Sequence, residues 1–143
     1  MSTPTHVTAQ ETHGAQRYAE AMASVAREAQ GAVAERRADL AAAERAARVT
    51  ESAADAARQE VRDAQGPQET HEARLYAEAM ASVAREAQGA VAERRADLAA
   101  AERAARVAES AADAARQEAQ AAQGVQDAAR EAINAEDPAT PTP

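Results

Sequence analysis

Residue types that commonly carry catalysis or bind metals are few in this chain, and they lie far apart. His6, His13 and His71 are the only imidazoles, and Cys is absent. Neither His13 nor His71 forms the His-x-x-x-His or Glu-x-x-His pattern that metal sites on helices use. We therefore interpret the histidines as structural or surface residues, and we expect no metal and no cofactor.

Carboxylates and hydroxyls are more numerous, but their spacing does not gather them into a site. Glu28, Asp39 and Asp55 spread over the surface of a predicted helix, and Ser24 and Ser82 have no base nearby in the sequence. Gly-rich phosphate loops and nucleophile elbows are missing. Because catalysis needs convergent polar groups in a dry, concave place, we predict that the protein is not an enzyme and has no small-molecule substrate.

The elements that position these side chains are Ala-rich helices. Ala makes up about a third of the chain, Phe and Trp are absent, and only seventeen residues besides Met1 are apolar and larger than Ala. A fully buried large apolar side chain contributes about 1.5–3 kcal/mol, whereas Ala offers one methyl group. The apolar surface must therefore be buried in a thin seam. Ala, Glu, Arg and Gln together indicate an all-α fold of long helices or a coiled coil.

The net charge limits the classes of partner that the protein is expected to bind. The net charge is −8, and all 16 basic residues are Arg. An acidic chain without a basic stripe does not suit a nucleic-acid backbone or an anionic membrane surface. We see no signal peptide and no apolar run that could span a bilayer. The localisation therefore stays open, with a cytoplasmic protein or a part of an assembled particle as the expectation.

A tandem repeat organises the sequence. Residues 11–68 and 69–126 match at 50 of 58 positions without a gap. A fixed period indicates a repeat architecture, in which each unit buries its apolar face on a neighbour. We divide the chain into an N-terminal tail and helix cap (1–10), the two helical repeats, and a helix end with a Pro/Thr-rich tail (127–143).

Each repeat is predicted to be one long helix. Thr8 and Glu11 have the spacing of a capping box, which predicts that the first helix begins after Thr8. Gly66 and Pro67 form the predicted hinge, where the first helix ends and the second begins. Gly suits the left-handed C′ position of the first helix, and Pro suits the first turn of the second.

The second helix is predicted to end near Asn134–Ala135, and residues 1–7 and 136–143 to form extended tails. Gly31 and Gly89 leave two alternatives within the repeats. Each is either a glycine inside a continuous helix, tolerated there or placed where helices approach closely, or a turn that makes each repeat a short hairpin. We favour continuity because no Pro, Asn or Ser cluster accompanies either glycine.

Apolar positions follow a three–four alternation from Val33 onward, which is typical of a coiled-coil heptad. The bulky residues before Val33 are out of step by one position, which we interpret as a stutter. Arg36 and its equivalent Arg94 fall on the seam, either as side chains that reach solvent at its edge or as buried charges paired across it. The predicted interaction seam consists of Tyr18, Met22, Val25, Val33 and Leu40, and of Tyr76, Met80, Val83, Val91 and Leu98.

The distribution of bulky residues predicts the pairing direction. Large side chains occupy the first half of each repeat and Ala the second half. If the chain folds back between Gly66 and Pro67, residue i faces about residue 133 − i, so that Tyr18 meets Ala115 and Tyr76 meets Ala57. Large side chains then pack on small ones, as interdigitated layers require. We therefore predict an antiparallel helical hairpin or coiled coil, which associates further into a larger bundle or assembly because its own seam is thin.

These observations favour a non-catalytic structural or assembly protein that acts through coiled-coil packing, as a spacer, a scaffold or a subunit of a filament, shell or virion. Its expected partner is a second copy of itself or another helical protein, and not a nucleic acid.

An alternative function follows from a resemblance. The Ala/Glu/Gln/Arg composition, with Thr-Ala-Gln-Glu-Thr at 8–12, resembles the late-embryogenesis-abundant helices associated with desiccation. The resemblance implies a stress-protective chain that folds conditionally. This sequence departs from that group in having no Lys, and a 58-residue repeat in place of an 11-residue one.

Overall fold

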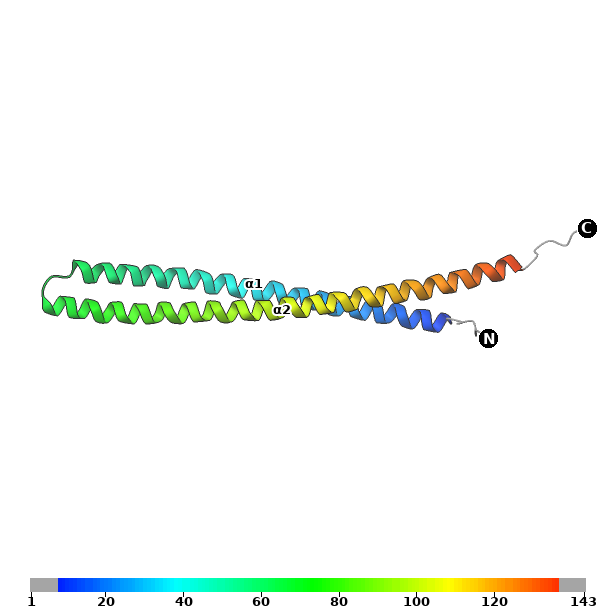
Figure 1. Ribbon diagram of the computed structural model, residues 1–143, viewed down its shortest axis with the longest axis horizontal. Coiled ribbons are helices and arrows are strands. Elements are labelled where there is room, and N and C mark those ends of the chain that lie inside the picture. Colours follow the sequence, from blue (N-terminus) through cyan, green and yellow to red (C-terminus); the bar gives the residue numbers. More distant parts are fainter. Residues whose placement is uncertain (1–7, 137–143) are drawn as a thin grey trace, which may run out of the picture. The chain divides into compact units, whose positions relative to one another are not determined.

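Two long helices make up nearly all of the described chain. The computed structural model describes residues 8–136, and within them α1 spans Ala9–Asp63 and α2 spans Pro67–Glu136, with no strand (Figure 1). The helices pack against each other, which confirms the predicted all-α helical hairpin. The predicted tail 1–7 and all but the first residue of the predicted tail 136–143 lie outside the described residues.

The first helix begins at the predicted capping box. The Thr8 hydroxyl accepts a hydrogen bond from the Glu11 backbone N–H at 3.2 Å, and the Glu11 carboxylate accepts one from the Thr8 N–H at 2.8 Å. These two bonds satisfy N–H groups that have no partner within the helix. The negative Glu11 side chain is also favourable at the positive N-terminal end of α1.

The connection between the helices lies where the Gly-Pro pair predicted it. Gly66 has φ +87°, a left-handed conformation that a side chain disfavours, and α2 begins at Pro67. The role of Gly66 differs from the prediction, however. Since α1 already ends at Asp63, Gly66 does not occupy its C′ position. Its carbonyl instead accepts the Thr70 N–H at 3.1 Å, which makes Gly66 the N-cap of α2.

Both helices thus begin at the same position of the repeat. Thr8 and Gly66 are 58 residues apart, and each carbonyl accepts a backbone N–H and a hydroxyl from the threonine four residues later. The end of the second repeat behaves differently, because helix α2 continues through Gly124. The residue after this glycine is Val125, whereas Pro67 follows Gly66. The chain therefore turns where proline removes a backbone donor and restricts the residue before it.

Gly31 and Gly89 lie inside continuous helices, so the prediction of two uninterrupted helices is confirmed. A Cβ added at either glycine would meet no atom within 4 Å from beyond its own local backbone. These glycines therefore do not mark a close approach between helices, which was one of the roles considered for them.

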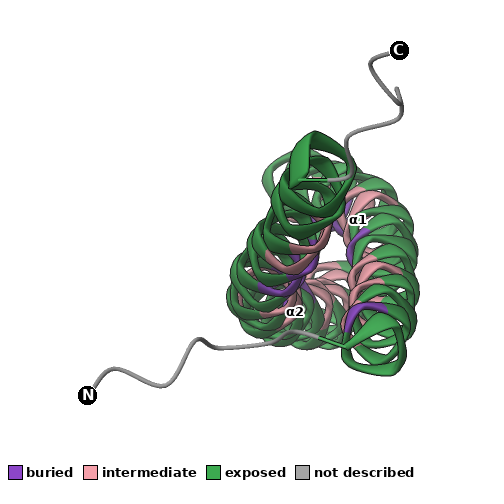
Figure 2. Cartoon of the chain, turned by 90° about the vertical axis from the view of Figure 1, so that its right-hand side faces the viewer, coloured by how far each residue is buried: buried purple, intermediate pink, exposed green. Residues whose placement is uncertain are grey.

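The described residues group into two compact units, which do not coincide with the sequence repeats. One unit is Gly31–Arg103, and the other combines residues 8–30 with 104–136. Each unit pairs a segment of α1 with an antiparallel segment of α2. Buried and half-buried residues lie on the facing sides of the two helices (Figure 2).

The seam follows an unbroken heptad on each helix. Every a and d position from Thr12 to Val61 on α1 and from Thr70 to Gln126 on α2 is buried or half-buried, except for Arg36 and Arg94. The predicted stutter is therefore wrong. Before Val33 the seam passes through small residues in regular register, because a continuous coiled coil requires one period throughout. The seam residues of this segment are Thr12, Ala15, Ala19, Met22, Ala26 and Ala29.

The register also differs from the prediction. In the contacts between long side chains, such as Gln88 with Glu51 or Arg95 with Glu44, the two residue numbers add up to 139 and not to 133. The predicted value assumed that the chain folds back midway between Gly66 and Pro67. The observed midpoint lies three residues later, within the first turn of α2.

Most large seam side chains lie level with small ones in this register, whereas Leu40 and Leu98 lie level with each other. Within the Gly31–Arg103 unit, Val91 and Ala47 lie at the same level, and both are buried. Arg36 and Arg94 occupy seam positions but are paired with Asp39 and Asp97 of their own helices, at 3.5 Å. Their side chains are about half exposed, so they reach solvent at the edge of the seam and are not paired across it.

Candidate interaction surface

The two helices expose two different flanks beside the seam. We call heptad positions e and b the polar flank, and positions g and c the apolar flank. In an antiparallel pair, e lies beside e and g beside g, so each flank is formed by both helices. The polar flank includes Gln30, Arg37 and Glu51 on α1, and the apolar flank includes Tyr18 and Val25.

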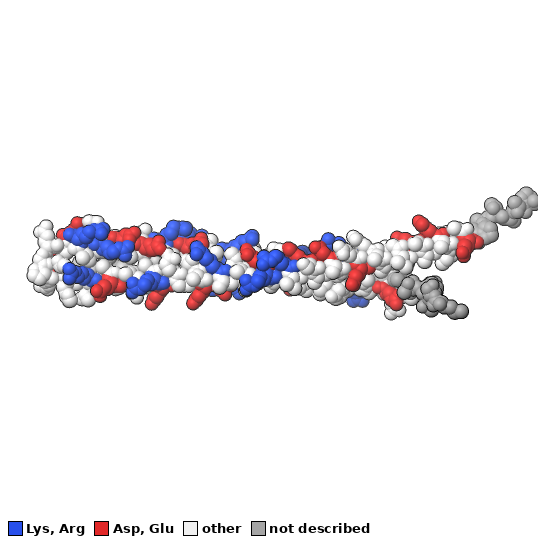
Figure 3. All heavy atoms as spheres, in the orientation of Figure 1, with Lys and Arg blue, Asp and Glu red and all other residues white. Residues whose placement is uncertain are grey.

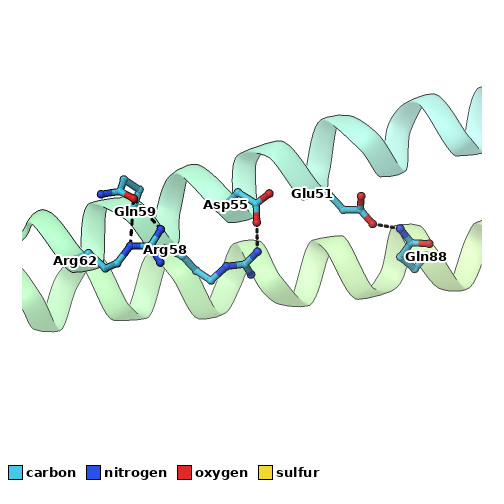
Figure 4. Close-up of polar contacts among 6 residues, drawn as sticks. All are labelled: Glu51, Asp55, Arg58, Gln59, Arg62 and Gln88. Carbon is cyan, nitrogen blue, oxygen red and sulfur yellow. Dashed lines mark hydrogen bonds and ion pairs between the residues drawn. The ribbon is translucent and has the colours of Figure 1, made fainter.

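Side chains on the polar flank link the helices. In the Gly31–Arg103 unit, Arg37 pairs with Glu102 at 3.6 Å, and Arg95 pairs with Glu44 at 3.7 Å. Gln88 of α2 donates a hydrogen bond to Glu51 of α1 (Figure 4). The two arginines are 67% exposed and the two glutamates slightly more than a third exposed, and exposed ion pairs contribute at most about 1 kcal/mol. The contacts therefore select the register of the helices more than they stabilise the fold.

The other unit repeats the pattern. Gln30 donates a hydrogen bond to Glu109, and this contact is the repeat equivalent of the one between Gln88 and Glu51. Gln16 donates a hydrogen bond to Gln123 at 3.2 Å. Each repeat thus supplies both halves of the same pairing.

A shallow groove opens on the polar flank of each unit, where small residues face each other. In residues 8–30 and 104–136 the groove is formed by Ala23, Ala26 and Ala112, with Arg27 and Arg116 at its rim. The equivalent groove of the other unit has Arg85 and Arg58 in the rim positions. Both grooves are open to solvent and arise from missing side-chain volume on an Ala seam.

The apolar flank carries large side chains that the hairpin does not cover. In residues 8–30 and 104–136, Tyr18 is 54% exposed, Val25 46% and Val107 71%. Their repeat equivalents in the Gly31–Arg103 unit are Tyr76 at 50%, Val83 at 41% and Val49 at 69%. Each unit therefore presents the same three large apolar residues on the same flank.

The two flanks also differ in the sign of their charges. Arg occurs at positions b, d, e and f of α1 and α2, and at neither g nor c. Blue Arg and red carboxylate side chains are interspersed along both helices on the face that Figure 3 shows. Charged residues at positions g and c are all acidic. On α1 they are Glu11, Glu28, Glu35, Asp39, Glu60 and Asp63, and on α2 Glu69, Glu72, Glu86, Glu93, Asp97 and Glu118.

The residues predicted for the interaction seam separate into three groups. Val33 and Val91 are buried between the helices. Met22, Leu40, Met80 and Leu98 lie at seam positions and are half-buried. Tyr18, Val25, Tyr76 and Val83 are exposed on the apolar flank, one position away from the seam.

No cluster of three or more His, Asp or Glu side chains within residues 8–136 has the arrangement of a metal site. Neither α1 nor α2 contains an apolar stretch long enough to cross a bilayer.

Comparison with protein-family models, with curated proteins and with solved structures finds no match to this chain.

Proposed function

We propose that the protein is a non-catalytic structural or assembly protein that acts through helix packing with a partner. One observation carries the proposal: each unit leaves the same three large apolar residues uncovered on one flank, among them Tyr18 and Tyr76. Contiguous exposed apolar side chains with polar surroundings are typical of interaction surfaces. A spacer, a scaffold or a subunit of a filament, shell or virion would use such a flank.

The thin core supports the same proposal. Val33 and Val91 are the only residues larger than Ala and Thr that are buried within residues 8–136. Most helical stability in proteins comes from the packing of an amphipathic face, and here the seam supplies little of it. Association through the apolar flank adds the missing buried area. The partner is a second copy or another helical protein.

The test combines circular dichroism with mass determination by light scattering over a concentration series. We expect a strong helical signal in dilute buffer, together with association through the apolar flank once a partner is present at sufficient concentration. A chain that is unfolded and strictly monomeric at every concentration would overturn the proposal.

The same measurement addresses the alternative function, a conditionally folded protective protein. The near absence of buried side chains larger than Ala is the observation that favours it. A chain that is coil in dilute buffer and gains helix only on drying or in alcohol has the behaviour of that class.

A further inference from the structure

We infer that the apolar flank of each unit binds a basic amphipathic helix of another polypeptide. This inference rests on the proposed function and names the partner's chemistry. It follows from the juxtaposition of exposed tyrosine and valine side chains with carboxylates alone at heptad positions g and c.

A helix is the occupant that fits the spacing. Tyr18 and Val25 are seven residues apart on α1, and Tyr76 and Val83 are seven apart on α2. Seven residues correspond to two turns, or about 10 Å along a helix. A third helix with the same heptad period can place its own apolar side chains between those of the flank, as the helices of a bundle do.

The partner must supply the large side chains. Between the exposed tyrosine and valine of each unit lie alanines, such as Ala21 on α1 and Ala79 on α2, which leave space beside the bulky residues. Leu, Ile, Met or Phe at the a and d positions of the partner would fill this space. Large-on-small packing also occurs in the hairpin's own seam, where the buried Val91 and Ala47 lie at the same level.

The charge of the flank selects the partner's charge. Glu28 and Glu118 border the apolar residues in residues 8–30 and 104–136, and Glu86 and Glu60 border them in the Gly31–Arg103 unit. A partner with Lys or Arg beside its apolar stripe places opposite charges at this rim. Electrostatic complementarity of this kind raises the association rate and excludes wrong partners.

The same rule disfavours a second copy of this chain. Two copies that met through their apolar flanks would bring carboxylates against carboxylates, and juxtaposed like charges are costly. The polar flank of a second copy does not fit either. Some of its arginines are already paired with carboxylates, as Arg37 is with Glu102 and Arg116 with Asp113. That flank also offers no exposed residue larger than Ala among its apolar side chains.

The probe is a synthetic helical peptide of about five turns, with Leu at positions a and d and Lys beside them. Its binding to the full chain is measured by fluorescence anisotropy and by titration calorimetry at low and high salt. We expect binding that weakens with salt, and a stoichiometry of two peptides per chain, one for each unit.

Charge reversal on the two flanks provides matched variants. Glu28→Arg with Glu86→Arg reverses one charge on the apolar flank of each unit and is expected to weaken binding about tenfold. Glu20→Arg with Glu78→Arg makes the same change on the polar flank and is expected to leave the affinity within about twofold. Equal losses in the two variants would mean that the peptide responds to net charge alone, which overturns the inference.

Apolar contacts are tested in the same way. Val25→Ser with Val83→Ser is expected to weaken binding about fivefold, because it removes buried apolar area from each site. Ala34→Ser with Ala92→Ser places the same residue on the polar flank and should have no effect on binding. An unchanged affinity in the valine variant would overturn the inference, provided that circular dichroism shows that the variant is as helical as the parent chain.

The outcomes separate this inference from the proposed function. The chain could be helical in dilute buffer, fail to bind the peptide, and self-associate more strongly in high salt. A second copy of the chain would then be what binds the apolar flank. That result overturns the inference and leaves the proposed function standing. A chain that is unfolded in dilute buffer overturns the proposed function itself.

Discussion

Replacing Gly31 and Gly89 by Ala should stabilise the protein, because both glycines lie inside continuous helices. Neither has a positive φ, and the added methyl group would meet no atom within 4 Å from beyond its own local backbone. Gly costs about 1 kcal/mol relative to Ala in a helix interior, since it loses more backbone freedom on folding. The double variant should therefore gain about 2 kcal/mol, and its Tm should rise by roughly 5–10 °C.

Thermal and urea unfolding, followed by circular dichroism at a fixed protein concentration, measures this gain. Gly66→Ala is the matched control of opposite sign, because Gly66 has φ +87° and Ala loses about 1–2 kcal/mol in a left-handed conformation. If Gly31→Ala with Gly89→Ala lowers the stability, then the glycines serve a bend or a close contact, and the reasoning from open helical positions fails.

Three further predictions follow from the seam and its ends. Val91→Ala should cost about 1–2 kcal/mol in unfolding free energy because Val91 is 3% exposed, whereas Val49→Ala on the surface should stay within about 0.5 kcal/mol. Thr8→Ala should remove about 1 kcal/mol of capping, seen as faster amide hydrogen exchange in the first turn of α1. A double-mutant cycle on Arg37 and Glu102 should give a coupling below about 1 kcal/mol that shrinks with added salt, and a larger value would contradict the exposure of the pair.

Local features of the fold could be predicted from the sequence because a few neighbouring residues determine them. The capping box at Thr8 and Glu11 and the break before Pro67 each depend on the backbone of one turn. The continuity of the helices through Gly31 and Gly89 could also be predicted, since an isolated glycine is tolerated within a long helix.

The pairing of the helices was harder to predict, because it depends on several turns at once. The expected seam followed the bulkiest residues, Tyr18 and Val25, and needed a stutter to reach Val33. The structure keeps the regular heptad and leaves both residues exposed. Six residues separate the predicted register from the observed one, because the residues that form the bend could not be counted from the position of Gly66 and Pro67 alone.

The asymmetry of the two flanks was missed, although the sequence contains it. Once the heptad is placed correctly, Arg falls at neither g nor c on either helix, and every charged residue at those positions is acidic. With the stutter in place, Tyr18 and Val25 were assigned to the seam, and the flank lost the apolar side chains that define it. A correct period therefore had to come before any conclusion about the surface.

The duplicated sequence affects whether the seam forms between two helices of one chain or between helices of two chains. In the contacts between α1 and α2, the two residue numbers add up to 139 in both units. The α2 helix of another copy would therefore offer α1 the same contacts as the α2 helix of its own chain. Only the three-residue connection ties the two helices together, and its equivalent in the second repeat, before Val125, stays helical. Pro67 thus stands at the turn, where the helical equivalent in the second repeat has Val125. Valine at position 67 would let one helix continue through the turn. Each helix would then pack against a helix of another molecule.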